Sequence, residues 1–155
     1  MIGLRQVVRA AQLSASGLQA ANFKSSEIWL NELIWRDKQC RVVCVEEPGY
    51  PGFCRAIWNA HVAEMTDLNE RERARLMRVV FELEAGLREL LRPDKINLAS
   101  LGNAVPHLHW HVIPRFRGDP HFPGPIWGAP LRQPVAAQRD LAPFKKALAK
   151  RLSRL

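Results

Sequence analysis

The sequence predicts an α+β fold, with a mainly antiparallel sheet of about five strands and helices packed on one face. One observation is a long amphipathic helix expected at 69–91. Another is the placement of short β-rich runs, at 40–46 and 53–58 before this helix and at 96–101 and 107–113 after it. Strands grouped on either side of one helix, rather than alternating with helices, favour antiparallel pairing.

The length and composition predict a single domain. A chain of 155 residues, of which 47% are hydrophobic and 25% charged, is typical of one soluble globular domain with its own core. We expect a single domain over 1–155, with its core at about 30–116. A basic extension at 1–27 precedes this core, and a loop and a basic helix at 117–155 follow it.

The long helix has an apolar stripe on one side and charged residues on the other. Asp67, with Glu70 three residues later, predicts an acidic N-cap, and Pro93 predicts the end of the helix. A second helix is expected from about Val135 into the basic tail. Hydrophobic residues recur along the long helix at steps of three and four, at Leu76, Val79, Val80, Leu83, Leu87 and Leu90.

Turn residues divide the β-rich runs. Two Pro-Gly pairs at 47–52 separate the runs before the helix, which predicts an antiparallel hairpin with a long loop. Gly102 and Asn103 separate the runs after the helix. Pro106 and Pro114 bracket the second of these, so the strand is expected to lie between them.

The cysteines and the net charge narrow the function classes. Cys40, Cys44 and Cys54 are odd in number and lack C-x-x-C spacing, which argues against a disulfide framework or a thiolate zinc site. A net charge of +8 favours anionic ligands such as nucleotides. Much of this charge falls on the C-terminal tail, where a solvated helix face explains it. A nucleic-acid partner is therefore not expected, and processing of nucleic-acid ends is only a third hypothesis.

The sequence predicts a cytoplasmic protein with no membrane association. No apolar run approaches the roughly 20 residues that span a bilayer, and the first residues lack the features of a secretory signal. The first 26 residues carry Arg5, Arg9 and Lys24 and no acidic residue. Targeting to an organelle is therefore the minor alternative.

The chemistry is concentrated in a run of three histidines. His107, His109 and His111 alternate with apolar residues, so a strand would project all three from one face. Packing does not require three neighbouring imidazoles, because each needs a polar partner when buried and titrates near neutral pH. The row therefore indicates a functional site.

Two kinds of chemistry suit such a row. A metal-dependent hydrolase could use the histidines as ligands, but the outer pair would lie about 13 Å apart along a strand, and no acidic residue lies close in sequence. Phosphoryl transfer fits better, because a neutral imidazole attacks phosphorus and a neighbouring imidazole assists the leaving group. We expect no metal and no required cofactor, with magnesium present only as the counter-ion of a polyphosphate substrate.

A known family shares this pattern. The segment from Leu101 to Arg115, with Gly102-Asn103 before His-Leu-His-Trp-His-Val-Ile, closely resembles the signature of the histidine triad family. The resemblance extends back through Pro51-Gly52 and residues 55–61 to Met65-Thr66-Asp67-Leu68, and covers about 30–116. It implies an α+β fold that forms homodimers.

The resemblance also implies a reaction. It is hydrolysis or transfer at the α-phosphate of a purine nucleotide, through a covalent nucleotidyl-histidine intermediate. Dinucleoside polyphosphates, nucleoside phosphoramidates and adenylates are the candidate substrates. His109 would be the nucleophile, His111 would contact the phosphate and assist the leaving group, and His107 would support them from behind. A nucleotide-binding module without turnover is the alternative.

Four further residues would bind the nucleotide by the same resemblance. His61 would be a fourth histidine beside the three, and Gly102 would lie at the phosphate. Asn97 and Asn103 would place amides near the ribose and phosphate, although Asn103 is shorter than the Gln that many members have there. Simple turn chemistry next to Gly102 is the other interpretation of the two asparagines.

Overall fold

The computed structural model describes residues 31–134 and 140–155. Within them, five strands form one sheet in the order β1-β2-β3-β5-β4, and every neighbouring pair is antiparallel. The α+β prediction is confirmed. The strands are β1 (Asn31–Arg36), β2 (Cys40–Val45), β3 (Cys54–Trp58), β4 (Lys95–Ser100) and β5 (His109–Arg115).

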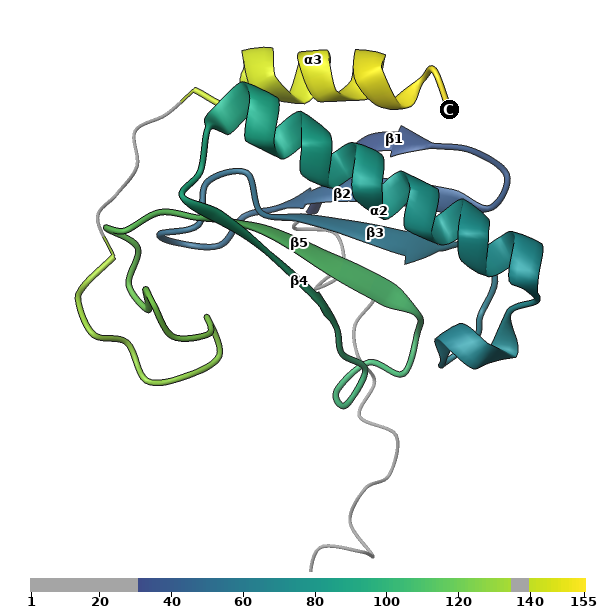
Figure 1. Cartoon of the computed structure of the whole chain (residues 1–155), viewed down its shortest axis with the longest axis horizontal. Helices are drawn as coiled ribbons and strands as arrows, with labels where there is room; N and C mark the ends of the chain where they lie inside the picture. The colour runs from purple at the N-terminus through teal and green to yellow at the C-terminus, as the bar shows by residue number, and fades with distance from the viewer. Residues whose placement is uncertain (1–30, 135–139) are drawn as a thin grey trace, which may run out of the picture. The chain divides into compact units, whose positions relative to one another are not determined.

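The helices cover one face of the sheet, which we call the helix face (Figure 1). Helix α2 (Glu70–Leu91) packs against the sheet, and α3 (Ala142–Leu152) lies beside α2. A short 3-10 turn, η2 (Met65–Asp67), leads into α2. In the described part of the chain, no helix is both long enough and apolar enough to cross a membrane.

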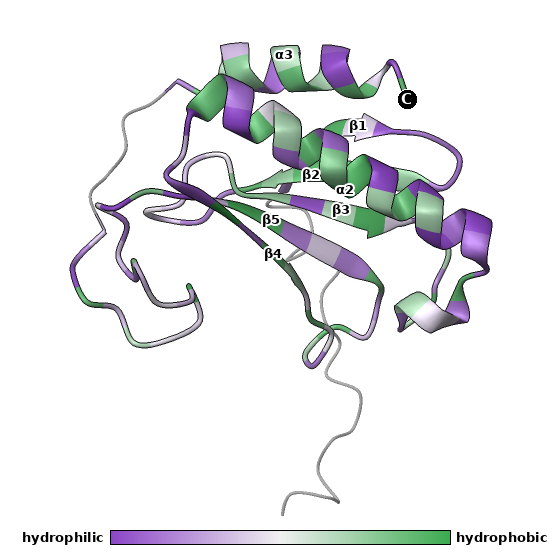
Figure 2. Ribbon diagram, viewed as in Figure 1, coloured by the Kyte–Doolittle hydropathy of each residue, from purple (hydrophilic) through white to green (hydrophobic). Residues whose placement is uncertain are grey.

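The main hydrophobic core lies between the helices and the sheet. Alternate residues of β2, β3 and β5 point into it, and hydrophobic positions recur along α2 between hydrophilic ones (Figure 2). Of the predicted stripe, all but Leu90 are fully buried; Leu90 is 38% exposed, and Leu91 is buried in its place. The stripe continues from Leu87 by a step of four rather than three. The core residues of α2 are Leu76, Val79, Val80, Leu83, Leu87 and Leu91.

The cap of α2 differs from the prediction. Asn69, not Asp67, is the N-cap: its side chain accepts a hydrogen bond from the Glu72 amide, and Glu72 returns one to the Asn69 amide. Asp67 instead accepts hydrogen bonds from the amides of Ala63 and Glu64 and closes η2. The prediction of an Asp67 cap was therefore wrong, because Asp67 belongs to a separate capping box with Glu64 around η2.

Two strands also differ from the prediction, which identified four of the five by position. The run predicted at 107–113 forms β5 at His109–Arg115 and passes through Pro114. Pairing with β3 ends at Val112, so Pro114 lies beside β4 alone and its missing amide hydrogen leaves no β3 bond unmade. Strand β1 was missed, because a bulge between Leu33 and Trp35 breaks its alternation.

The second predicted helix is shorter at its start than expected. Helix α3 begins at Ala142, whereas the prediction began at about Val135. Residues 135–139 lie outside the described residues, as does the basic extension predicted at 1–27. Leu148 and Leu152 of α3 are fully buried against the core.

The opposite face of the sheet, which we call the histidine face, carries no helix formed by residues 31–134 or 140–155. A smaller hydrophobic cluster lies there, formed by Val45, Tyr50, Phe53 and Ile113, with Ile126 packed against it. The segment 116–134, which we call the strap, leaves the end of β5 and folds on the side of the sheet away from the helices (Figure 1). The histidine face therefore supplies both the hydrophobic and the polar side chains that surround the histidines.

Candidate active site

Two histidines of β5 form the centre of the site. His109 and His111 are two residues apart on one strand, so they share the histidine face. Their Nε2 atoms lie 3.0 Å apart, and their rings meet edge to face at 4.7 Å between centroids. The Nδ1 of His109 donates to the backbone carbonyl of His107 at 2.6 Å. In a neutral ring this leaves the Nε2 of His109 unprotonated, so its lone pair faces the Nε2–H of His111.

His107 lies just before the strand and belongs to a second pair. Its Nε2 contacts the carbonyl oxygen of Trp58 at 2.7 Å, and its Nδ1 lies 3.2 Å from the Nδ1 of His61. The row of three predicted on one strand is therefore a pair within β5 and a neighbour outside it. His107 orients the nucleophile candidate through its main-chain carbonyl, because that oxygen fixes the tautomer and ring plane of His109.

Burial and nearby positive charge keep the central pair neutral. His111 is only 5% exposed, and burial, then His109 and then Arg55 lower its pKa from 6.5 to about 3. Burial is also the main cause that lowers the pKa of His109, with Arg55 and His107 adding to it, although the hydrogen bond to the His107 carbonyl opposes the change. A neutral imidazole is the nucleophilic form.

Aromatic side chains flank His111. The rings of Phe53 and Trp127 lie 5.6 Å and 5.2 Å from it between centroids. Trp127 belongs to the strap and remains 53% exposed. Trp127 also borders an open cleft of about 570 Å³ between the strap and β4, which is further lined by Asn97, Ala99, Ile113, Pro125 and Ile126. Neither histidine lines this cleft, which also reaches Glu84 of α2, so it adjoins the histidine pair only through Trp127.

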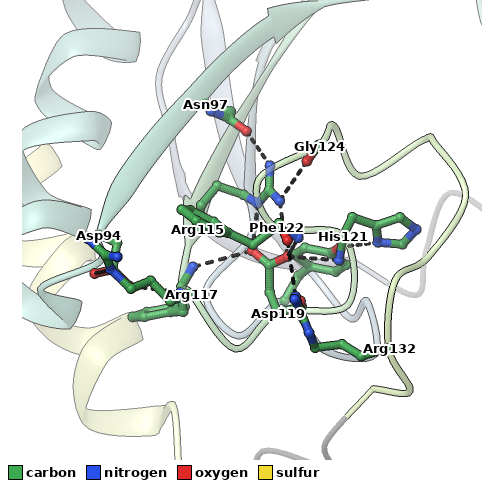
Figure 3. A network of polar contacts seen from close by, with 11 residues as sticks. Asp94, Asn97, Arg115, Arg117, Asp119, His121, Phe122, Gly124 and Arg132 are labelled. Atoms are coloured by element: carbon green, nitrogen blue, oxygen red, sulfur yellow. Dashed lines mark hydrogen bonds and ion pairs between the residues drawn. The ribbon is translucent and has the colours of Figure 1, made fainter.

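A buried ion pair holds the strap in place (Figure 3). The guanidinium of Arg115, at the end of β5, donates to both carboxylate oxygens of Asp119, at 2.7 and 3.0 Å, and to the carbonyl of Gly124 at 2.8 Å. Asp119 also accepts from the amides of His121 and Phe122, and the Tyr50 hydroxyl bonds to His121. These contacts position the segment that carries Trp127.

The structure separates the predicted nucleotide-binding residues. Asn97 projects onto the histidine face, but its Oδ1 accepts from Arg115 at 2.6 Å, which leaves its Nδ2 for a ligand (Figure 3). Gly102 and Asn103 lie in the exposed loop between β4 and β5. A Cβ at Gly102 would meet nothing closer than 3.7 Å. His61 lies beside His107 rather than beside His109.

Three elements of the site did not emerge as functional from the sequence alone. Arg55 on β3, Trp127, and the Arg115–Asp119 pair all contact or support the histidine pair. Arg55 had a detectable signal, because it is the one charged residue within the otherwise apolar run 53–58. No group of three or more His, Cys, Asp or Glu side chains in 31–134 and 140–155 is arranged to hold a metal ion.

Comparison with known proteins identifies the family. The model of the HIT domain matches residues 30–118, more than half of the chain, and includes His61 and the histidines of the central pair. The chain belongs to the HIT domain family. The similarity to the histidine triad signature that the sequence indicated is thereby confirmed.

Two solved structures of histidine triad proteins are similar to this HIT protein over most of its length. A histidine triad protein from Bradyrhizobium japonicum is 30% identical, covers 83% of this chain and 95% of its own, and superposes with a TM-score of 0.71. One from Marinobacter aquaeolei is 31% identical, with coverage of 81% and 90% and a TM-score of 0.67.

The curated relative is an AP-4-A phosphorylase from Mycobacterium tuberculosis. It is 31% identical over 81 residues, which are 48% of this chain and 42% of that protein. This HIT protein therefore matches less than half of the length of the curated relative.

Proposed function

We propose that this HIT protein is an enzyme that cleaves purine nucleoside phosphate derivatives at the α-phosphate, through a covalent nucleotidyl intermediate on His109. The observation that carries the proposal is the fixed tautomer of His109. Its Nδ1–H is held by the His107 carbonyl, so its lone pair is on Nε2, which lies 3.0 Å from the Nε2 that carries the proton of His111. A phosphate placed there would meet a nucleophile and a hydrogen-bond donor together.

The reaction would run in two steps. In the first, the Nε2 of His109 attacks the α-phosphorus, a P–N bond forms, and the bond from phosphorus to the leaving group breaks. The leaving atom accepts the hydrogen bond of protonated His111 and takes its proton, which leaves His111 neutral. In the second step, an acceptor attacks the same phosphorus and the P–N bond breaks. If the acceptor is water, His111 takes up its proton, and both histidines return to their starting forms. With water as the acceptor, the product is a nucleoside monophosphate.

The negative charge of the substrate would prepare the proton transfer. In the ligand-free site, burial, His109 and Arg55 lower the pKa of His111 to about 3, so the ring is neutral. A bound phosphate brings opposite charge to the same place, which favours the protonated imidazole and raises this pKa. His111 would therefore gain its catalytic proton only when substrate is present.

The similar proteins support a nucleotide substrate without choosing the acceptor. The M. tuberculosis relative is named for phosphorolysis of a dinucleoside polyphosphate, in which phosphate rather than water takes the nucleotide. Hydrolysis and transfer share the first step and the same intermediate. We propose hydrolysis as the default, with phosphate as the acceptor to compare.

The experiment is a panel of adenosine derivatives with different leaving groups, scored by release of AMP or, with added phosphate, of ADP. Rapid acid-free quenching with α-labelled substrate should trap a base-stable, acid-labile phosphoramidate that maps to His109. AMP binding without turnover of any panel member would instead favour the non-catalytic module. Label on another residue would refute the assigned nucleophile.

We also propose that no metal ion is required. Exhaustive chelation should leave the cleavage of an adenosine phosphoramidate unchanged, because the nucleophile and donor are both imidazoles. Loss of this activity on chelation and its recovery with zinc would favour the metal-dependent hydrolase. Polyphosphate substrates are unsuitable for this test, since magnesium binds to them directly.

We propose, finally, that the protein is a homodimer. The outer edge of β4 pairs with no other strand in the described residues, and Phe81 on the adjoining helix α2 is 56% exposed. An unpaired edge next to an exposed aromatic residue favours association with a second copy. Light scattering at micromolar concentration should give twice the chain mass, and a fully active monomer would contradict the proposal.

A further inference from the structure

Arg55 lies directly opposite His111 on the neighbouring strand. The two residues are register partners of the antiparallel pair β3 and β5, so their side chains leave the same face with Cβ atoms about 5 Å apart. The guanidinium of Arg55 lies over the ring of Phe53, 5.6 Å from its centroid, and the same ring packs against His111. Arg55 therefore belongs to the wall of the active site.

The charge of Arg55 is not neutralised within the described residues. Its half-buried side chain makes no ion pair there, and its Nε is buried without a hydrogen-bond partner. The acidic residue that raises the pKa of Arg55 is Glu47, an exposed residue of the β2–β3 loop. Burial lowers the pKa of Arg55, a sign that its charge is poorly solvated. A partly buried cation without a partner is unfavourable for the folded protein alone.

Other half-buried or buried arginines of this domain differ in this respect. Arg115 is bound by Asp119 and Asn97, Arg75 by Asp37, and Arg41 donates to the Oδ1 of Asn59 at 3.0 Å. Arg41 is the closest comparison, because it lies on β2 with its side chain on the histidine face and has similar burial. The free hydrogen-bonding capacity of Arg55 is thus specific to its position beside His111.

We propose that Arg55 binds a second phosphate of the substrate, the one next to the phosphate that His109 attacks. This inference rests on the proposed function and specifies its leaving group as anionic. His109 and His111 on β5 face the attacked phosphorus, and Arg55 lies one strand away, so the phosphate chain would run across the sheet from β5 to β3. The planar guanidinium offers a two-pronged contact to phosphate oxygens that a neutral amine leaving group cannot use.

The direct test is equilibrium binding of AMP and ADP to the full-length protein in the presence of a chelator. Arg55→Leu should weaken ADP binding by about 10- to 100-fold, the usual effect of losing a charged hydrogen bond, and AMP binding by less than about threefold. Arg55→Lys should recover part of the ADP affinity. Arg41→Leu, which removes the same charge from the same face, should leave both affinities within about twofold.

The same variants should divide the substrates in kinetic assays. Arg55→Leu should lower kcat/KM for a dinucleoside polyphosphate by a similar factor and lower kcat/KM for an adenosine phosphoramidate by a much smaller one. Thermal unfolding of each variant checks that it is folded, and Arg55→Gln replaces Arg55→Leu if the latter is not. Equal losses for AMP and ADP, or no loss for either, would overturn the proposal. If the wild type binds ADP through Arg55 but turns over no panel member, the proposed function fails while this inference stands.

Discussion

The two faces of the sheet divide stability and chemistry between them. On the helix face, α2 and α3 seal an almost entirely apolar core in which even Cys40, Cys44 and Cys54 are buried. The histidine face has a smaller apolar cluster and carries the buried polar residues of the described segments, which are His111, Arg115 and Asp119. We therefore expect substitutions on the helix face to act mainly on stability and substitutions of the histidine pair to act mainly on the chemistry.

Strand β5 shows how one segment serves both faces. Trp110 and Val112 point toward the helices, and the Trp110 indole donates to the sulfur of Met65. His109, His111 and Ile113 point the other way. Successive side chains of β5 lie on opposite faces of the sheet. Substitutions two residues apart should therefore both affect stability or both affect the chemistry, whereas substitutions of adjacent residues should differ in this respect.

The largest expected effect is on the histidine face. His109→Ala removes the proposed nucleophile, so turnover should fall by about 10⁴-fold or more and reach background with every leaving group, because the proposed two-step route would be lost. The unfolding midpoint and AMP affinity should stay near the wild-type values. His111→Ala should be milder, about 10²- to 10⁴-fold, and mildest with good leaving groups.

A tenth of wild-type turnover in His109→Ala would contradict the assignment of His109. The control is Trp110→Phe, one residue away on the helix face, which should lower stability modestly and leave the chemistry per folded molecule unchanged.

The strap should respond next, because it connects the two properties. Asp119→Ala leaves the 2% exposed guanidinium of Arg115 without its carboxylate, and breaking such a buried pair costs about 3–5 kcal/mol. Urea unfolding gives the global part of this loss, and hydrogen exchange over 116–134 gives the local opening. If exchange in this segment and turnover both stay at wild-type values, the pair does not hold the strap.

Acid should open the strap in the same way. Burial opposes ionisation of Asp119, but hydrogen bonds from Arg115 and from the His121 and Phe122 amides outweigh it, so its pKa lies below 3.8. A carboxylate with a lowered folded pKa stabilises the native form above the unfolded value, and this contribution disappears as pH falls through the folded pKa. The protection of the strap amides from hydrogen exchange should therefore fall below about pH 4 in the wild type, and should not change there in Asp119→Ala.

The helix face gives the third effect, which falls on stability alone. Leu83 is fully buried between α2 and the sheet, so Leu83→Ala should cost about 2–5 kcal/mol of unfolding free energy. Leu90 on the same helix is exposed, and Leu90→Ala should cost less than about 1 kcal/mol. Below its unfolding midpoint, Leu83→Ala should cleave substrate at the wild-type rate, and a large fall in kcat would show that the faces are coupled.

Local patterns were enough to predict α2, the β2–β3 hairpin and the common face of His109 and His111. Each depends on periodicity or turn residues within one segment. Strand β1 was not predictable in this way, since its bulge breaks the alternation and its pairing with β2 decides its conformation. The buried Arg115–Asp119 pair depends on how the strap folds back, and the unpaired state of Arg55 depends on which acids lie near it in space. Only tertiary structure contains that information.

The smallest effect concerns the protonation of the His111 imidazole. His111 faces His109 on its own strand, Arg55 on β3, and the uncharged rings of Phe53 and Trp127. Burial, His109 and Arg55 together lower its pKa to about 3, so NMR of the ligand-free protein should show a neutral His111 imidazole from pH 8 down to about pH 4. An unfolded chain protonates this residue near pH 6.5, so the contribution of His111 to stability should fall as pH drops from that value toward 3.

Arg55→Leu should raise the pKa of His111 by removing one positive charge, and bound AMP should raise it further by adding negative charge. Arg41→Leu should leave it unchanged, since Arg41 is not among the groups that shift His111. A ligand-free His111 that titrates near pH 6.5 would mean that the site is open to water and that its proton does not depend on the substrate.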